Sequence, residues 1–462
     1  MYRAHHLSLL KSTVAAACIS AISCFAYAEK SDAATPQTLL HDKVQQLISQ
    51  KVEDGEFASV IIGISDGQHH QFAGFSAKGQ PVPDKNSIYE IGSLTKPMPA
   101  LILAKQIQQG RIKAAQPVAE LAPECMPAAS AGLSISWLDL ATHTSGLPRL
   151  PENLQPKNMA NPYADYTQKD LNSYIQTIKN LPGKGKYDYS NLGYGMLGCA
   201  LAAVSGKPFE QLIREEISKP FGMPSTGIQL SAEMQKRLQG GHDASGKPVS
   251  GWDFDAMAAA GAVRSDAADM LRYLDTLMAA ARTDQASAEK LVQTAQRDTS
   301  MQKMRIAFGW HLSNMYGRDM VWHNGMTGGY ASFAAFSADG KLGVIVLTNT
   351  ARSPEALGIA ALFPQQLPER KAVRLSAEAL QQFSGRYALT PAFIITVTPG
   401  NNSLTIQASG QPAFRAAVIA EDSFEIPEVG AVITFQRDAD GRISQLTLQQ
   451  NGQRIPGKKL AD

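Results

Sequence analysis

The sequence has almost no net charge and no apolar run long enough to cross a membrane. It contains 43 Lys and Arg residues against 41 Asp and Glu residues. A chain without excess positive charge has no net attraction for nucleic acid or for anionic lipid. A membrane-spanning helix needs ~20 consecutive apolar residues, and no segment of the chain reaches that length. We therefore expect no nucleic-acid partner and no stable membrane insertion.

Cysteine is also scarce, with four residues in a chain of 462. Two of them lie in the first 28 residues, which leaves Cys125 and Cys199 in the rest of the chain. In an oxidising compartment these two can form a disulfide, but two buried free thiols fit the sequence equally well. No cluster of His, Cys and acidic residues indicates a metal, and no Gly-rich loop indicates a bound phosphate. We therefore expect no metal and no other cofactor.

The first 28 residues have the pattern of a secretion signal. Arg3 and Lys11 give a positive start, an apolar stretch follows, and small residues precede a cleavage point after Ala28. Cys18 and Cys24 allow a lipid anchor in principle, but the residues before each fit that signal poorly. Removal of this segment leaves 41 residues of each charge sign, because it holds two basic residues and no acidic ones. The sequence therefore predicts a periplasmic or secreted protein.

The order of expected strands and helices predicts two folded parts. Two strand-like segments, "ASVIIGISDG" and "QHHQFAGFSA", are joined at the turn signal Asp66-Gly67, which predicts a hairpin. A mostly helical region that ends near Ala295 follows, and strands then return. This pattern indicates an α+β domain with one antiparallel sheet, flanking helices and a helical lobe. Short β-rich segments then alternate with turns, which indicates a small all-β, barrel-like domain. The predicted organisation is a signal peptide (1–28), an α+β domain (29–365), a linker (366–375) and a β-rich domain (376–462).

One short motif raises a chemical question. Ser93 and Lys96 stand three residues apart where an apolar helical pattern begins. Residues at this spacing lie on one face of a helix, with roughly 5–6 Å between their Cβ atoms, so the amine can lie beside the hydroxyl. Ser-x-x-Lys occurs at three other places, however: Ser8–Lys11, Ser287–Lys290 and Ser300–Lys303. The pair alone therefore fits both a catalytic nucleophile and a solvated helix end.

Two further motifs follow in the chain. Of 13 tyrosines only Tyr189 opens a Tyr-x-Asn triplet, which ends at Asn191, and of nine histidines only His323 opens His-x-Gly, which ends at Gly325. In this order the three motifs resemble those of the class C β-lactamase and penicillin-binding-protein family of serine hydrolases. The stretches "LATHTSGLP" and "GAVRSDAADMLRYL" also resemble this family. The resemblance covers about residues 40–365, and the chain after it is similar to a β-rich module that often follows such hydrolases.

The resemblance implies a role for each residue of the first two motifs. Ser93 would be the nucleophile, Lys96 its neighbour and Tyr189 the base, because a serine hydroxyl is a poor nucleophile until a base takes its proton. A free tyrosine has a pKa near ~10; an ammonium on Lys96 would favour the phenolate, whereas burial would disfavour both charges. Asn191 would bond Lys96 and a substrate amide. Without the resemblance, the sequence would predict that Tyr189 is a buried core residue and that Asn191 caps a helix.

The resemblance also implies how a substrate carbonyl is held. The backbone N–H groups of Ser93 and Met326 would bind the developing oxyanion. Gly325 would be small so that the substrate backbone can approach the strand. The turn His143–Gly146, although it contains a histidine and a serine, would be structural.

His323 bears on the substrate. The β-lactamases mostly carry lysine at this position, where a fixed charge attracts the substrate carboxylate, and an ordinary histidine with a pKa of ~6.5 is mainly neutral at pH 7. We therefore predict a peptidase acting on D-amino-acyl peptides, or an esterase. A class C-like β-lactamase and a penicillin-binding or sensing protein with little turnover are the alternatives. If His323 titrates normally, turnover of anionic substrates should rise as the pH falls through ~6.5. The sequence gives no indication of the oligomeric state.

Overall fold

The computed structural model describes residues 38–126, 133–299, 304–367 and 374–460, except positions 392, 401, 412, 427, 428, 430, 451 and 452. The predicted signal segment, residues 1–28, lies outside the described residues. Within the described ranges, none of the helices is both long enough and apolar enough to cross a membrane.

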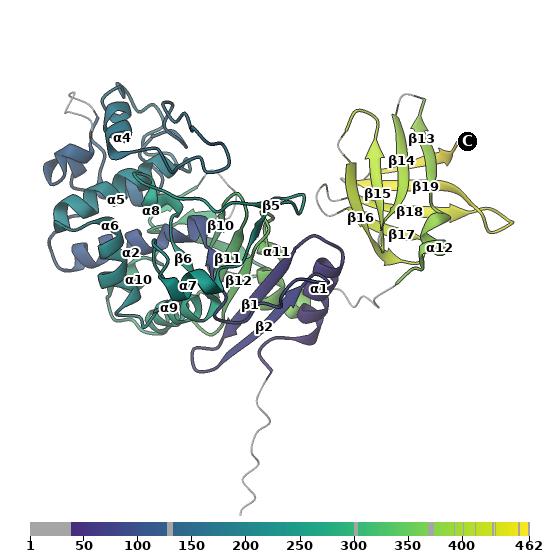
Figure 1. The fold of residues 1–462 in the computed structure, drawn as a ribbon, viewed down its shortest axis with the longest axis horizontal. Helices are drawn as coiled ribbons and strands as arrows, with labels where there is room; N and C mark the ends of the chain where they lie inside the picture. The colour runs from purple at the N-terminus through teal and green to yellow at the C-terminus, as the bar shows by residue number, and fades with distance from the viewer. Residues whose placement is uncertain are drawn as a thin grey trace, which may run out of the picture. The chain divides into compact units, whose positions relative to one another are not determined.

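The first folded part is built on an antiparallel sheet of eight strands (Figure 1). The strand order is β2-β1-β12-β11-β10-β9-β8-β7, so β1, from the start of this part, pairs with β12, from its end. The strands are β1 (Ser59–Ser65), β2 (His70–Ser76), β7 (Arg297–Asp298), β8 (Met304–Ile306), β9 (His311–Met315), β10 (Arg318–Met326), β11 (Ala331–Ser337) and β12 (Gly343–Thr348). The predicted hairpin is confirmed, since β1 pairs with β2 and Gly67 adopts the positive φ that the turn requires.

Helices cover both faces of this sheet. Successive side chains of a strand point to opposite faces, so Val60 and Ile62 of β1 pack with α1 (Asp42–Glu53) and α11 (Glu355–Leu362). Ile61 packs with the larger helical lobe. The helices of the lobe are α2 (Pro97–Gln108), α3 (Trp137–Ala141), α4 (Gln168–Ile175), α5 (Asn191–Ser205), α6 (Phe209–Leu212), α7 (Ala232–Arg237), α8 (Ala258–Gly261), α9 (Ala267–Ala281) and α10 (Ala288–Leu291). Two short strand pairs accompany them: β3 (Tyr89–Glu90) with β6 (Arg264–Ser265), and β4 (Gly241–His242) with β5 (Pro248–Val249).

The start of α2 accommodates two prolines. Pro97 is the first residue of the helix and Pro99 the third. The first amide N–H groups of a helix have no partner within it, so neither proline removes a helical hydrogen bond. The helix can therefore begin directly after Lys96.

The second folded part is a closed barrel. Its eight strands pair in chain order and the last pairs with the first. The strands are β13 (Gly385–Thr390), β14 (Phe393–Gly400), β15 (Ser403–Ala408), β16 (Ala413–Ala420), β17 (Ser423–Ile426), β18 (Ala431–Arg437), β19 (Ile443–Gln450) and β20 (Gln453–Lys459). Phe383, just after α12 (Ala377–Gln381), packs inside against Phe424 and Phe435. The α+β class and the barrel-like domain are confirmed, whereas the exact domain boundaries remain a prediction.

Cys125 and Cys199 form a disulfide. It joins the 3₁₀ turn Pro123–Cys125 to α5, across 74 residues of sequence. This settles the choice that the sequence left open between a disulfide and two free thiols.

Removing the disulfide should destabilise the helical lobe. A crosslink that closes a loop of 74 residues restricts the unfolded chain, which stabilises the fold by roughly 4 kcal/mol in the chain-entropy description. We expect the double variant Cys125→Ala/Cys199→Ala to melt about 5–10 °C below the wild type. Thermal denaturation with and without a reductant checks this, because the reductant should lower the wild-type Tm and leave that of the double variant unchanged. Equal melting of both proteins would show that the crosslink contributes no stability.

Candidate active site

Ser93 and Lys96 meet as their spacing predicts. Ser93 lies in a 3₁₀ turn, η1 (Gly92–Thr95), and Lys96 joins this turn to α2. The Lys96 Nζ lies 2.9 Å from the Ser93 Oγ and donates a hydrogen bond of 2.6 Å to the carbonyl of Ala260 in α8. The Lys96 side chain is fully buried. Burial, reinforced by the positive charge of Arg149, holds the pKa of the Lys96 amine well below its usual range.

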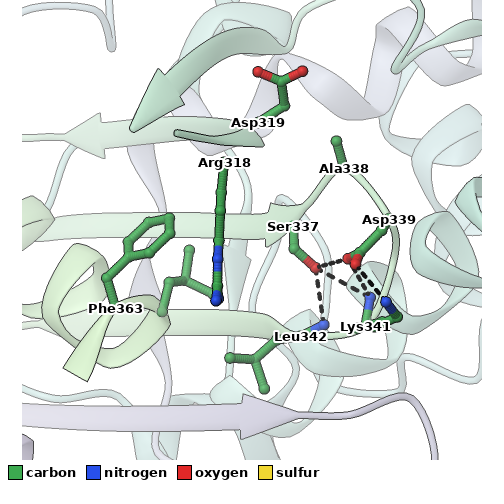
Figure 2. Close-up of a pocket in the computed structure, with 9 residues that line it drawn as sticks. Arg318, Asp319, Ser337, Ala338, Asp339, Lys341, Leu342 and Phe363 are labelled. Atoms are coloured by element: carbon green, nitrogen blue, oxygen red, sulfur yellow. Dashed lines mark hydrogen bonds and ion pairs between the residues drawn. The ribbon is translucent and has the colours of Figure 1, made fainter. Parts of the chain in front are cut away.

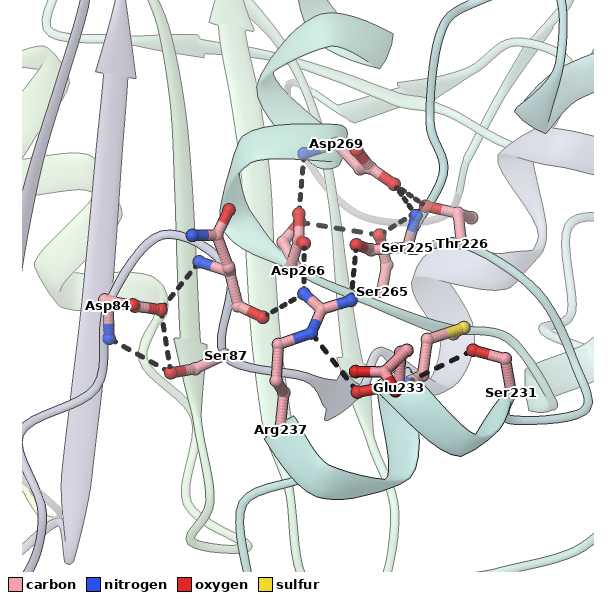
Figure 3. Close-up of polar contacts among 12 residues, drawn as sticks. Asp84, Ser87, Ser225, Thr226, Ser231, Glu233, Arg237, Ser265, Asp266 and Asp269 are labelled. Carbon is pink, nitrogen blue, oxygen red and sulfur yellow. Dashed lines mark hydrogen bonds and ion pairs between the residues drawn. The ribbon is translucent and has the colours of Figure 1, made fainter.

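A polar network fixes the chain just beyond Ala260. Asp266 caps α9 by accepting a hydrogen bond of 2.8 Å from the Asp269 amide. Arg237 of α7 pairs with the Asp266 carboxylate at 3.3 Å and donates to the Ser225 hydroxyl at 3.0 Å (Figure 3). The family-like stretch "GAVRSDAADMLRYL" therefore runs from the end of α8 through β6 into α9. It directly follows Ala260, whose carbonyl accepts the hydrogen bond from Lys96.

Tyr189 is held beside this pair by the start of α5. Ser190, the N-cap of α5, donates its amide N–H to the Nδ1 of His143 at 3.0 Å. The His143 ring stacks on the Tyr189 ring with 4.4 Å between centroids. Ser93 lies close enough to the Tyr189 hydroxyl to lower its pKa, and the Lys96 Nζ lies 4.9 Å from the centre of the Tyr189 ring. The three residues of the predicted catalytic group therefore come together.

Burial shifts the pKa values of Lys96 and Tyr189 in opposite directions. Burial raises the pKa of the Tyr189 phenol above its usual range, and the nearby Ser93 side chain offsets this only in part. Burial also lowers the pKa of the Lys96 amine, so it favours the uncharged form of both side chains. Of the two opposing influences expected from the sequence, burial outweighs the attraction between ammonium and phenolate.

Asn191 presents an unpaired acceptor. Its amide N–H donates to the Arg149 carbonyl at 2.9 Å. Its Oδ1 is buried and has no hydrogen-bond partner among the residues described. Since the Lys96 Nζ bonds Ser93 and Ala260, the expected contact between Lys96 and Asn191 is not formed in this structure. A buried acceptor without a partner is costly, which suits the predicted role of binding a substrate N–H.

His323 faces the helical lobe from β10. Alternate residues of this strand point to opposite faces, and Asn324 donates to Glu355 of α11 at 3.2 Å on the other side. The His323 ring is fully buried, with its centroid 6.3 Å from that of Tyr189. It also stacks on His311, with 5.1 Å between centroids. His323 and Asn324 therefore point to opposite faces of the sheet.

The expectation that His323 titrates near pH 6.5 is wrong. Burial is the main cause, and the neighbouring His311 and Lys96 add to it; together they hold the pKa of His323 well below its usual range. The imidazole therefore stays neutral in the pH range where an exposed histidine gains a proton. No rise in the turnover of anionic substrates is expected from His323 as the pH falls through ~6.5.

The expected reason for Gly325 is also wrong. A Cβ at this position would lie 2.0 Å from the Ile91 carbonyl oxygen and 2.9 Å from the Ser93 amide nitrogen. The protein's own 3₁₀ turn, rather than substrate, therefore occupies the space beside Gly325. Gly92 shows the same contact from the other side, since its Cβ would lie 2.6 Å from the Met326 nitrogen, and its φ is +52°. Close backbone approach brings the Ser93 turn against the end of β10 and explains both glycines.

Met326 contributes its backbone to this contact and exposes its side chain. Its amide lies beside Gly92, and the Ser93 amide lies beside Gly325. The two predicted oxyanion donors are thus brought to neighbouring positions, although their role remains a prediction. Within the described residues, no three His, Cys, Asp or Glu side chains gather in a way that could hold a metal ion.

Sequence reasoning missed three residues around the site. His143 was assigned to a structural turn, but its ring also supports Tyr189. His311 stacks on His323 and its Nε2 hydrogen-bonds with the Tyr187 hydroxyl at 2.9 Å. Arg149 places its guanidinium carbon 5.0 Å from the centre of the Tyr189 ring. The only signal in the sequence was that His143 lies within the family-like stretch "LATHTSGLP" and that Arg149 directly follows it.

An antiparallel sheet with a helical lobe, and a serine in contact with a buried lysine and tyrosine, define a serine hydrolase of the β-lactamase and transpeptidase fold. The chain belongs to the Beta-lactamase family, whose sequence pattern matches residues 44–364. Members of this family act through an acyl-enzyme on the serine.

The relatives include both peptidases and β-lactamases. The chain is 29% identical over 348 residues to the D-alanyl-D-alanine-carboxypeptidase/endopeptidase AmpH of Escherichia coli, covering 66% of this chain and 87% of that protein. It is 28% identical over 297 residues to a β-lactamase of Providencia stuartii, covering 63% and 70%. The structure of the octameric penicillin-binding protein homologue from Pyrococcus abyssi matches the fold with a TM-score of 0.64 at 21% identity, covering 90% of this chain and 99% of that one.

Proposed function

We propose that the chain is a periplasmic or secreted hydrolase that forms an acyl-enzyme on Ser93 and acts as a D-amino-acid peptidase or an esterase. The observation that carries the proposal is the contact of 2.9 Å between the Ser93 Oγ and the buried amine of Lys96, with Tyr189 beside them. Burial lowers the pKa of this amine well below its usual range, which favours its uncharged form. A neutral amine has a lone pair that can take up the serine proton, which an ammonium lacks.

The arrangement supports a cycle in which one proton moves back and forth. The Ser93 Oγ attacks the substrate carbonyl carbon, and its proton passes to the pair formed by Lys96 and Tyr189. The carbonyl oxygen becomes an oxyanion beside the amides of Ser93 and Met326. As the bond to the leaving nitrogen or oxygen breaks, the pair returns the proton to the leaving group. Water then repeats the sequence on the acyl-enzyme and releases the acid.

Peptidase or ester substrates rank first because His323 supplies no fixed charge. Its ring is buried and neutral where the resembling β-lactamases carry a lysine. The name of the Escherichia coli relative, a D-alanyl-D-alanine carboxypeptidase and endopeptidase, favours the same reading. The Providencia stuartii relative supports a class C-like β-lactamase as the second candidate. A penicillin-binding or sensing protein with little turnover is the third, since the geometry does not fix the deacylation rate.

The proposed location rests on two observations. The first 28 residues have the pattern of a cleavable signal, with the cut after Ala28. The disulfide between Cys125 and Cys199 suits an oxidising compartment such as the periplasm. We also propose that the barrel, predicted as residues 376–462, supplies no catalytic residue, because every residue of the proposed site lies earlier in the chain.

Covalent labelling tests the proposal. A fluorescent phosphonate, or a fluorescent penicillin, should label the wild type with one adduct on the peptide that contains Ser93, and Ser93→Ala should not be labelled. Intact-mass measurement and peptide mapping check this, with Ser145→Ala, a serine of the structural turn, as the matched control. Labelling of Ser93→Ala to the wild-type extent would contradict the assignment. Hydrolysis of nitrocefin, a p-nitrophenyl ester and a D-alanyl-D-alanine peptide then ranks the three candidate activities.

A further inference from the structure

Arg149 places a permanent positive charge beside the proposed site. Among the described residues, the charged or titratable groups that shift the pKa values of Lys96, His143, His311 and His323 are basic, and none is a carboxylate. One of these groups is Arg149, whose charge reaches both Lys96 and His143. A pocket with uncompensated positive charge attracts an anionic ligand.

Arg149 is the only member of this group that has a permanent charge and an exposed side chain. Its guanidinium lies over the Tyr189 ring, 5.0 Å from the ring centre, and it makes no ion pair with a carboxylate of the described residues. By contrast, Arg237, Arg264 and Arg272 each pair with a carboxylate. Arg149 is therefore a free cation beside the tyrosine that contacts the nucleophile.

The backbone of Arg149 is fixed although its side chain is exposed. Its carbonyl accepts hydrogen bonds from the amides of Asn191 at 2.9 Å and Leu192 at 3.3 Å, at the start of α5. The preceding carbonyl, of Pro148, accepts from the Ser190 hydroxyl at 2.7 Å. The Arg149 side chain therefore extends from a fixed backbone position next to Asn191, whose Oδ1 has no hydrogen-bond partner among the described residues.

We propose that Arg149 binds a carboxylate of the substrate and so sets the preference of this enzyme for anionic substrates, an inference that rests on the proposed hydrolase function. A guanidinium presents a planar fork of N–H donors that matches a carboxylate with two parallel hydrogen bonds. His323 cannot fill this role, because it is buried and neutral. Since Arg149 adjoins Asn191, the carboxylate belongs to the acyl part of the substrate, on the side whose amide Asn191 would bind.

Matched esters test the proposal in the full-length protein. p-Nitrophenyl hemisuccinate and p-nitrophenyl butyrate share a leaving group and differ by a carboxylate in the acyl part, and 3-carboxyphenyl butyrate carries the carboxylate in the leaving group instead. Arg149→Gln should lower the ratio of kcat/KM for hemisuccinate to that for butyrate by about five- to thirty-fold. This effect is larger than that of losing an exposed ion pair and at the lower end of that of losing a charge-assisted hydrogen bond. Arg149→Lys should lie between the wild type and Arg149→Gln. The ratio cancels any general effect on Tyr189.

Arg318→Gln is the matched control for the loss of one exposed charge. Arg318 begins β10, at the opposite end from Met326, and lines a separate surface hollow with Ser337 and Asp339 (Figure 2). Its removal should leave the ratio unchanged. An Arg149→Gln ratio equal to that of the wild type, or a fall only for 3-carboxyphenyl butyrate, would overturn the assignment to the acyl part.

A binding measurement separates this inference from the proposed hydrolase activity. Ser93→Ala cannot form the acyl-enzyme, so equilibrium binding of p-nitrophenyl hemisuccinate to it reports recognition alone. Ser93→Ala/Arg149→Gln should bind about five-fold or more weakly, and the difference should shrink at high salt. Equal binding by the two proteins, or no binding by either, would show that Arg149 is an ordinary surface arginine. Failure of the proposed function would instead appear as unlabelled Ser93 with this difference in binding intact.

Discussion

Replacing Lys96 with Met or Tyr189 with Phe should lower kcat/KM for a neutral ester by about 10²–10⁴-fold while the protein stays folded. Both changes remove a proton-accepting group from Ser93 but keep a side chain of similar size in a buried position. The double variant should lose little more activity than the less active of the two single variants. The reason is that Lys96 and Tyr189 accept one proton as a coupled pair. Steady-state kinetics with p-nitrophenyl butyrate, together with melting curves, measure this.

The control for this result is Tyr166→Phe, which removes a buried phenol that donates to Asn153 at 2.8 Å instead of contacting Ser93. It should retain near-wild-type activity. Since burial holds the pKa of Lys96 well below its usual range, the pH at which kcat/KM of the wild type begins to fall should lie well below the pKa of an exposed lysine. The rate should fall there because the amine gains a proton and can no longer accept one. Additive losses in the double variant would contradict a coupled pair.

Gly325→Ala should lower kcat/KM by about 100-fold or more and the Tm by several degrees. The new Cβ would lie 2.0 Å from the Ile91 carbonyl oxygen, a backbone atom that cannot move without moving the turn that carries Ser93. Misplacing a reacting group by ~1 Å can cost ~10² in rate. Overpacking of this kind typically destabilises a fold by ~1–3 kcal/mol. Kinetics and thermal denaturation of the purified variant measure both effects.

Gly240→Ala is the matched control. A Cβ at Gly240 meets no atom within 4 Å, and its backbone has no positive φ. This variant should therefore retain both activity and Tm. Wild-type activity in Gly325→Ala would mean that the contact between β10 and the 3₁₀ turn does not position Ser93.

Most of the fold and the central residues of the site could be predicted from local sequence patterns. The hairpin at Gly67 followed from alternating apolar residues and a turn dipeptide, and the placement of Ser93 beside Lys96 followed from helical spacing. The relevance of Tyr189 followed from the order of three motifs in one chain. These features depend on residues that are near each other in sequence, or on a resemblance that such motifs carry.

Other parts of the site depend on residues that are distant in sequence. Arg149 and His311 reach Tyr189 and His323 only because α5 and β9 bring them there. No spacing rule relates such residues before the chain folds. The pairing of Cys125 with Cys199 is of the same kind, since the sequence shows the two cysteines but not their distance.

The sequence by itself determined the class of fold and indicated that Ser93, Lys96 and Tyr189 form the proposed catalytic group, because helical periodicity and ordered motifs depend on local residue types. The tertiary structure alone decided the charge state of the site and the reason for Gly325. Burial sets the pKa values of Lys96, Tyr189 and His323, and burial arises only when α2, α5 and β10 pack together. The space beside Gly325 is likewise filled by the turn that carries Ser93, a contact that forms only between packed elements.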